Sequence, residues 1–164
     1  MVRRQIAGRG IADRRVLAAM EKVPREAFLA EAMQEFAYED TPLPIEEGQT
    51  MSQPYIVARM VEAADVGASD RVLEIGAGSG YAAAVLGELA GRVFTIERHP
   101  ALAELARARL RIAWEMLGQV AERLDLLPLA ARGHVADALS ALAQAKALLE
   151  ERHAAKEKED GFGY

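Results

Sequence analysis

The alternation of apolar and polar positions divides the chain into three zones, residues 1–67, 68–110 and 111–164. In the first zone, apolar residues recur at roughly helical spacing up to Pro24, where the pattern breaks, and again from Ile56 to Ala64. Residues 26–38 predict a further short helix. Residues 39–54 are rich in proline and predict an ordered loop. We therefore expect a helical cap with a loop-rich middle.

The second zone predicts a strand, a helix and a second strand. Val72, Leu73 and Ile75 form a short apolar run that ends in glycines, as a buried parallel strand does. Residues 81–90 have a helical pattern, and residues 93–97 form a second apolar run that ends at an acid. A strand–helix–strand segment of this length is typical of a right-handed βαβ unit.

The third zone carries apolar residues every seven positions. They are Leu110, Leu117 and Leu124, followed by Val135, Leu142 and Leu149. This repeat predicts a seam between helices, with helices over residues 101–127 and 134–152 and a turn between Pro128 and Gly133. We expect no strand after residue 97. The resulting hairpin would bury its seam against the sheet or a second copy, so a homo-oligomer through residues 110–149 is expected.

Composition narrows the classes of function. The net charge of −5 argues against a general nucleic-acid binder, which needs a basic surface to neutralise phosphates. The chain has no cysteine, which excludes disulfides, thiolate zinc sites and a cysteine nucleophile. No apolar run is long enough to cross a membrane, and we expect a cytoplasmic protein.

A glycine-rich segment follows the first predicted strand and opens a helix. It reads Glu74-Ile75-Gly76-Ala77-Gly78-Ser79-Gly80-Tyr81. Glycines there let the backbone turn sharply and approach a ligand, and the free N–H groups of the helix start favour an anionic group. Glu97 stands twenty-one residues after Gly76 at the end of the next strand, where a carboxylate can accept both hydroxyls of a ribose. The alternative is a tight strand-to-helix turn that binds nothing.

The spacing of these glycines distinguishes between cofactors. A dinucleotide fingerprint has the spacing G-x-G-x-x-G, whereas here the third glycine comes one residue early and Tyr81 takes its place. The spacing G-x-G-x-G after the acid Glu74 looks like methyltransferase motif I, with S-adenosylmethionine as the cofactor. A nicotinamide-dependent oxidoreductase is the weaker reading, because the chain offers no catalytic pair of a histidine and an acid.

A second informative segment, Gly48-Gln49-Thr50-Met51-Ser52-Gln53-Pro54, lies upstream in the proline-rich loop. On local grounds, Ser52 is a candidate cap for the helix that starts near Pro54. The other reading is a hydroxyl group presented to a substrate.

The chain resembles the bacterial protein-L-isoaspartate O-methyltransferases from residue 1 to about residue 110. The segments that carry the resemblance, besides the glycine-rich segment and the Ser52 loop, are Val2-Arg3-Arg4-Gln5-Ile6, Arg9-Gly10-Ile11 with Asp13, Val16-Leu17-Ala18-Ala19-Met20 and Val23-Pro24-Arg25-Glu26-Ala27-Phe28, continued by Tyr38, Asp40, Pro42, Leu43 and Pro44. The resemblance implies methyl transfer from S-adenosylmethionine to the carboxylate of isoaspartyl residues in damaged proteins, with isoaspartyl peptides and proteins as the partners.

The same resemblance assigns roles to particular residues. Ser52 would lie beside the substrate carboxylate as the catalytic residue. The positions that would bind the cofactor are Thr50, Gln53, Glu74, Gly76, Gly78, Gly80 and Glu97. No metal is required, since the acceptor carboxylate is already ionised at neutral pH.

The implied fold is α/β, a Rossmann-like methyltransferase sheet with an N-terminal helical cap. After Leu110 the family supplies further strands, none of which the sequence pattern indicates, so we expect a truncated sheet followed by the helical hairpin. The alternative function is therefore a catalytically inactive, methyltransferase-like protein that binds cofactor or self-associates through its helical tail.

Overall fold

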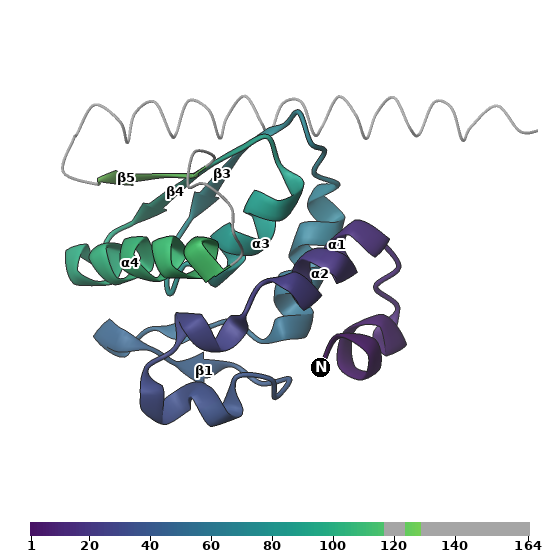
Figure 1. The fold of residues 1–164 in the computed structure, drawn as a ribbon, viewed down its shortest axis with the longest axis horizontal. Helices are drawn as coiled ribbons and strands as arrows, with labels where there is room; N and C mark the ends of the chain where they lie inside the picture. Colours follow the sequence, from purple (N-terminus) through teal and green to yellow (C-terminus); the bar gives the residue numbers. More distant parts are fainter. Residues whose placement is uncertain (117–123, 129–164) are drawn as a thin grey trace, which may run out of the picture. The chain divides into compact units, whose positions relative to one another are not determined.

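The computed structural model describes residues 1–116 and 124–128 of the chain. These residues belong to one structural unit, Met1–Pro128. They form an α/β fold with a parallel sheet, helices on one face of it and a helical cap at the N-terminus (Figure 1). The predicted fold class is confirmed. None of the helices in these residues is long and apolar enough to span a membrane.

The sheet contains three parallel strands in the order β3-β4-β5. Their bounds are β3 Arg71–Ile75, β4 Arg92–Glu97 and β5 Leu124–Pro128. Val72 pairs with Val93, and Val93 pairs with Leu124 on its other side. The two strands predicted from the second zone are confirmed, and β4 is the central strand.

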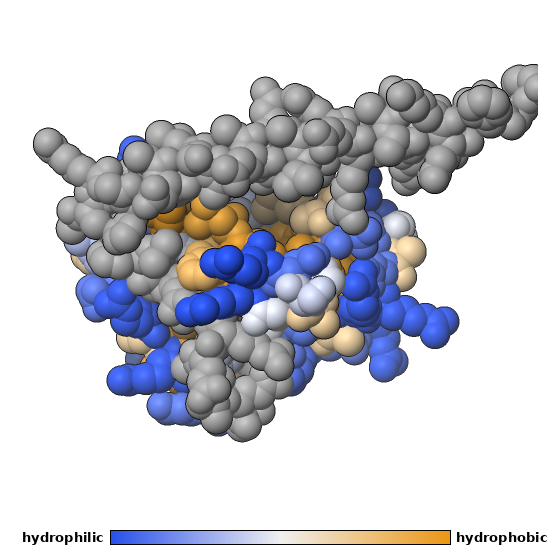
Figure 2. Space-filling model, turned by 90° about the horizontal axis from the view of Figure 1, so that it is seen from above, coloured by the Kyte–Doolittle hydropathy of each residue, from blue (hydrophilic) through white to orange (hydrophobic). Residues whose placement is uncertain are grey.

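Helices α3 (Tyr81–Leu89) and α4 (Pro100–Met116) lie on the same face of this sheet (Figure 1). Burial follows the pleat of β4, in which Val93 and Thr95 are fully buried beneath the helices. Ile75 of β3 pairs with Ile96 of β4, and it lies on the face of the sheet opposite to Val93 and Thr95. Its side chain is 59% exposed. The prediction that β3 is a buried strand is therefore wrong for this residue. Hydrophobic side chains are visible on the upper face of the molecule (Figure 2).

The N-terminal cap contacts α3 through its helix α1 and α4 through its element η3. Its elements are η1 Val2–Ile6, η2 Ala7–Arg9, α1 Arg14–Lys22, η3 Arg25–Phe28, η4 Glu31–Phe36 and α2 Pro54–Ala64. Helix α1 begins where the Asp13 carboxylate accepts a hydrogen bond from the Arg15 N–H. The single helix predicted over residues 26–38 is instead η3 and η4, which are separated at Leu29 and Ala30 by extended backbone.

The loop predicted over residues 39–54 is a small hairpin. Strands β1 Leu43–Pro44 and β2 Thr50–Met51 pair antiparallel, and η5 Glu46–Gly48 joins them. Positive φ angles at Glu47 (57°) and Gly48 (61°) reverse the chain there. This hairpin leads into Ser52 and then into α2.

The structure corrects the prediction for the third zone. Within the described residues α4 spans Pro100–Met116 and Leu124–Pro128 is a strand, so a single helix over residues 101–127 and the absence of strands after residue 97 are both wrong. Leu110 is buried in the core of its own chain, which also removes it from an intermolecular seam. The helix predicted over residues 134–152 lies outside the described residues. Association through residues 110–149 stays a prediction.

Candidate active site

The glycine loop joins β3 to α3 with a backbone that only glycine adopts readily. The φ angles are +89° at Gly76, +55° at Gly78 and +93° at Gly80. The Ile96 carbonyl oxygen accepts hydrogen bonds from the N–H groups of Gly76 and Ala77, which ties the start of the loop to β4. A Cβ atom at Gly76 would meet nothing within 4 Å, so a ligand has room to approach this backbone.

Gly80 has a different role, because its backbone is packed against α4. A Cβ atom there would lie 3.2 Å from Leu110 Cγ and 3.3 Å from the Ala106 carbonyl oxygen. Ser79, which is buried, accepts a hydrogen bond from the Tyr81 N–H and so satisfies a donor in the first turn of α3. The predicted glycines therefore divide into an open group, which includes Gly76, and a packing position at Gly80.

Glu97 fastens the glycine loop to the end of β4. Its Oε2 atom accepts a hydrogen bond of 2.9 Å from the Gly78 N–H, and its Oε1 atom accepts one of 3.0 Å from the His99 N–H. Each carboxylate oxygen has two acceptor positions, so both oxygens retain capacity for a further donor. The residue is 6% exposed. Its predicted role with ribose hydroxyls stays a prediction, and its role in holding the loop was not foreseen.

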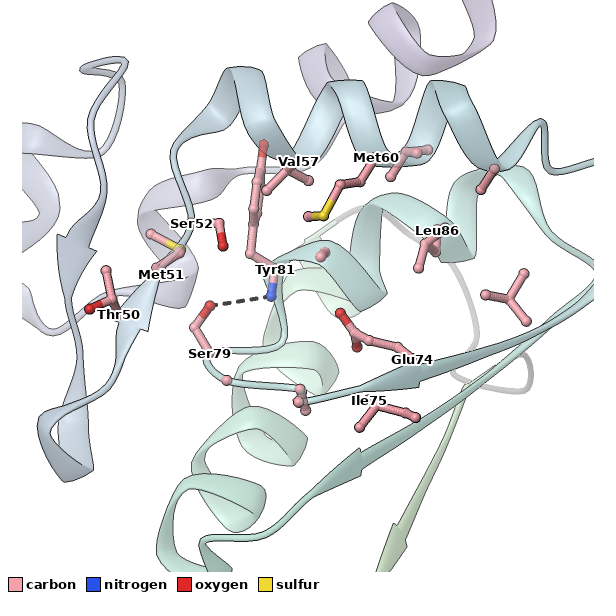
Figure 3. A pocket seen from close by; sticks show the side chains of 17 residues that line it. Thr50, Met51, Ser52, Val57, Met60, Glu74, Ile75, Ser79, Tyr81 and Leu86 are labelled. Atoms are coloured by element: carbon pink, nitrogen blue, oxygen red, sulfur yellow. Dashed lines mark hydrogen bonds between the residues drawn. The ribbon is translucent and has the colours of Figure 1, made fainter. Parts of the chain in front are cut away.

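Ser52 lies between β2 and α2 with an exposed side chain. Figure 3 shows it pointing toward Ser79 of the glycine loop and Tyr81 at the start of α3. The N-cap residue of α2 is Gln53, which makes no side-chain capping bond, and the Asp40 carboxylate accepts the hydrogen bond of the Tyr55 N–H instead. The reading of Ser52 as a helix cap is therefore wrong.

The Ser52 loop and the glycine loop line one cavity of about 390 Å³. The predicted site residues that line it are Thr50, Ser52, Glu74, Gly76 and Gly78 (Figure 3). Apolar side chains of α2, among them Val57, Met60 and Val61, form much of the opposite wall. The sequence analysis predicted a helix here from its apolar spacing, but not which of its residues would line a cavity.

Three predicted site residues do not line this cavity, namely Gln53, Gly80 and Glu97. The Gln53 side-chain amide donates hydrogen bonds of 2.9 Å to both the carbonyl and the carboxylate of Asp40. Asp40 also forms an ion pair of 2.6 Å with Arg9. Gln53 therefore anchors the Ser52 loop to the cap, and its predicted contact with cofactor stays a prediction.

Glu74 extends from β3 toward α3 on the face that the helices cover (Figure 3). Its Oε2 atom accepts a hydrogen bond of 2.6 Å from Thr95 Oγ1. Burial raises the pKa of Glu74 to about 7, and the negative charge of Glu97 acts in the same direction. This carboxyl group is therefore poised to change its charge near neutral pH.

Two arginines in the neighbourhood were missed by the sequence analysis. The Arg109 guanidinium of α4 donates hydrogen bonds of 3.0 Å and 2.5 Å to the two carboxylate oxygens of Glu46 in the β1–β2 hairpin, and it holds the pKa of that carboxyl below its usual range. Arg25 is fully buried and donates a hydrogen bond of 3.0 Å to the Ser52 carbonyl oxygen. No local spacing pattern marks either contact, because the partners are far apart in sequence.

Comparison with known families bears on this arrangement. The sequence profile of the family described as "Protein-L-isoaspartate(D-aspartate) O-methyltransferase" matches residues 1–122. The chain belongs to this family. A protein-L-isoaspartate O-methyltransferase of Rhodopseudomonas palustris is 69% identical over 110 residues, which are 67% of this chain and 50% of that protein. One of Protochlamydia amoebophila is 60% identical over 111 residues, which are 68% and 53% of the two chains.

Solved structures give the same picture of the fold. A protein-L-isoaspartate O-methyltransferase matches with a TM-score of 0.63 and 30% identity, over 74% of this chain and 39% of that chain. A Plasmodium falciparum beta-aspartate methyltransferase in complex with S-adenosyl-L-homocysteine matches with a TM-score of 0.61 and 22% identity, over 77% and 60% of the two chains. The chain spans about half the length of the curated relatives that it matches.

Proposed function

We propose that this chain takes part in methyl transfer from S-adenosylmethionine to the carboxylate of L-isoaspartyl residues in damaged peptides and proteins. The observation that carries the proposal is that Ser52 and the glycine loop line one cavity, although more than twenty residues of sequence separate them. Membership of the family and the names of the relatives support the same reaction.

The residues present fit the cofactor. The backbone at Gly76 is exposed and leaves room beside it, so the aminoacyl part of S-adenosylmethionine can approach the loop closely. The Glu97 carboxylate stands at the end of β4 with unused acceptor positions, as ribose hydroxyls require. We assign cofactor binding to Gly76, Gly78 and Glu97 on these grounds, with Thr50 and Glu74 on the wall of the cavity.

The chemistry asks the protein for positioning more than for proton transfer. S-adenosylmethionine, when bound, supplies an electrophilic methyl group on a sulfonium. An isoaspartyl carboxylate has a pKa of about 4 and is already a nucleophile at neutral pH. The Ser52 hydroxyl group donates a hydrogen bond to this carboxylate and fixes the direction of attack. Holding reactants in line in this way contributes several kcal/mol to lowering a barrier.

A second function is favoured by one specific observation. Within the described residues, β3 pairs only with β4, so its outer edge has no partner strand, and Ile75 on this strand is 59% exposed. A cavity with an incomplete wall is compatible with cofactor binding without turnover. The alternative is therefore a methyltransferase-like binding protein.

The cytoplasmic location and self-association also remain proposals. Cell fractionation tests the location, and light scattering tests self-association.

Transfer of a labelled methyl group to an isoaspartyl peptide, compared with its normal aspartyl twin, tests the first function. We expect labelling of the isoaspartyl peptide alone, and loss of most of it in Ser52→Ala. Ser69→Ala is the matched control, since Ser69 is exposed and does not line the cavity. Equal labelling of both peptides would refute the substrate assignment. No labelling with intact binding of S-adenosylhomocysteine would favour the second function.

A further inference from the structure

Arg25, the first residue of η3, is a fully buried charged residue. Burying a guanidinium group costs several kcal/mol unless its donors are satisfied by hydrogen bonds. Burial also lowers the pKa of Arg25 from its ordinary value. The contacts of Arg25 therefore indicate which segments of the chain it connects.

The guanidinium group of Arg25 joins three segments of the chain. Its Nε atom donates a hydrogen bond of 2.8 Å to the Ala37 carbonyl oxygen at the end of η4. Its Nη2 atom donates one of 3.0 Å to the Ser52 carbonyl oxygen. Its Cζ atom lies 4.7 Å from the centre of the Tyr81 ring. The same ring packs edge-to-face against Phe28, with 5.7 Å between the two ring centres.

Two of these three segments line the cavity of the candidate site. Ser52 carries the hydroxyl group, and Tyr81 is the first residue of α3, directly after the glycine loop. Arg25 itself does not line the cavity. Its contacts connect the Ser52 backbone to Tyr81, which directly follows the glycine loop where the cofactor would bind.

The charge of Arg25 is not neutralised by a direct ion pair within the described residues. Its hydrogen-bond acceptors there are carbonyl oxygens, and its Nη1 atom is buried without a partner. The neighbouring Asp40 carboxylate is instead bonded by Arg9, Gln53 and the Tyr55 N–H. A buried positive charge behind the Ser52 carbonyl favours an anionic group in front of it, because the low-dielectric interior screens it weakly.

We propose that Arg25 is a positioning residue for the carboxylate substrate, acting through the Ser52 backbone and leaving cofactor binding largely unaffected. The inference rests on the proposed methyl transfer. Arg25→Lys is the informative variant, since an ammonium group keeps the charge but cannot span the Ala37 and Ser52 carbonyl oxygens as a planar fork does. Arg14→Lys, at an exposed site on α1, is the matched control.

A double-mutant cycle with Ser52→Ala separates positioning from general damage. We expect Arg25→Lys to lower kcat/KM for the isoaspartyl peptide by about tenfold, through a raised KM, as loss of a hydrogen bond from a charged donor does. The Kd of S-adenosylhomocysteine should stay within about twofold, and the effect on kcat/KM should nearly vanish in the Ser52→Ala background. Equal losses in both backgrounds, or a parallel loss of S-adenosylhomocysteine affinity, would overturn the inference.

Hydrogen exchange tests the role of Arg25 without relying on methyl transfer. If the parent protein transfers no methyl group, that result counts against the proposed function and not against the role of Arg25. Arg25→Lys should speed amide exchange in residues 50–53 by about tenfold and leave α1 unchanged. Unchanged exchange in residues 50–53, or a rise of equal size throughout α1 and α3, would show that Arg25 does not hold the Ser52 loop. Arg25→Met repeats the measurement without the charge.

Discussion

Replacing Glu74 with glutamine should change how the stability of the protein depends on pH. In the folded chain this carboxyl group accepts a hydrogen bond from Thr95, and burial raises its pKa from 4.5 to about 7. Glutamine keeps the shape of the side chain and a carbonyl oxygen for Thr95, but it has no charge at any pH. The substitution therefore isolates the cost of holding a carboxylate at this place.

The sign and size of the effect follow from the two pKa values. Between pH 4.5 and about 7, the folded chain keeps a proton on Glu74 that the unfolded chain has released. The stabilisation due to this proton is complete below pH 4.5 and is lost as pH rises through about 7. At about 1.4 kcal/mol per pH unit the full interval is worth ~3 kcal/mol, and partial solvent exposure of the side chain reduces this to about 1–3 kcal/mol.

Urea unfolding at about pH 5 and about pH 8 measures the effect directly. We expect the free energy of unfolding of Glu74→Gln, relative to that of the parent, to be higher by about 1–3 kcal/mol at the higher pH than at the lower pH. Glu35→Gln, at an exposed site in η4, is the control for removing a carboxylate from the surface. A difference between Glu74→Gln and the parent that is the same at both pH values would refute the reasoning.

Two further predictions concern the glycine loop. Glu97→Ala should weaken binding of S-adenosylhomocysteine by about 1–3 kcal/mol in calorimetry, because it removes a charged acceptor from the Gly78 N–H and from the ribose site; parent-like affinity would contradict that assignment. Gly80→Ala should lower the free energy of unfolding by about 2–4 kcal/mol, through a positive φ and crowding against Leu110. Gly10→Ala, with a φ of +98° but nothing within 4 Å, should lose only about 1 kcal/mol, and equal losses at both sites would exclude a role for crowding.

The parts of the fold that the sequence predicted correctly are those with a local signal. β3 and β4 were predicted from short apolar runs, and the glycine loop from residues that need positive φ. β5 was missed because Leu110 and Leu124 stand two heptads apart, which imitates a helical seam. Leu110 is a core residue of α4 whereas Leu124 begins a strand, so the spacing joins a helix to a strand and does not belong to one helix.

The candidate site was predicted as a set of residues but not as an arrangement. The pattern around Ser52 left two readings open, and the structure excluded the capping role, because Gln53 is the N-cap residue of α2 and Asp40 accepts the hydrogen bond of the Tyr55 N–H. The exposure of Ile75 was missed because an apolar run shows that a strand is suited to burial, not that a neighbouring element covers it. The roles of Arg25 and Glu97 as anchors depend on contacts between distant segments, which no local pattern encodes.

The ion pair between Arg109 and Glu46 connects the longest helix of the described residues to the hairpin that leads into Ser52. Arg109 is largely buried, so added salt screens this pair less than it screens a surface pair. The hairpin is thus fastened to α4 without a ligand, and on the proposed function little ordering entropy would be lost when a peptide binds. A damaged peptide, which is itself flexible, would then meet a rigid receptor, and discrimination between normal and isomerised backbones would come from the geometry of the protein rather than from mutual adjustment.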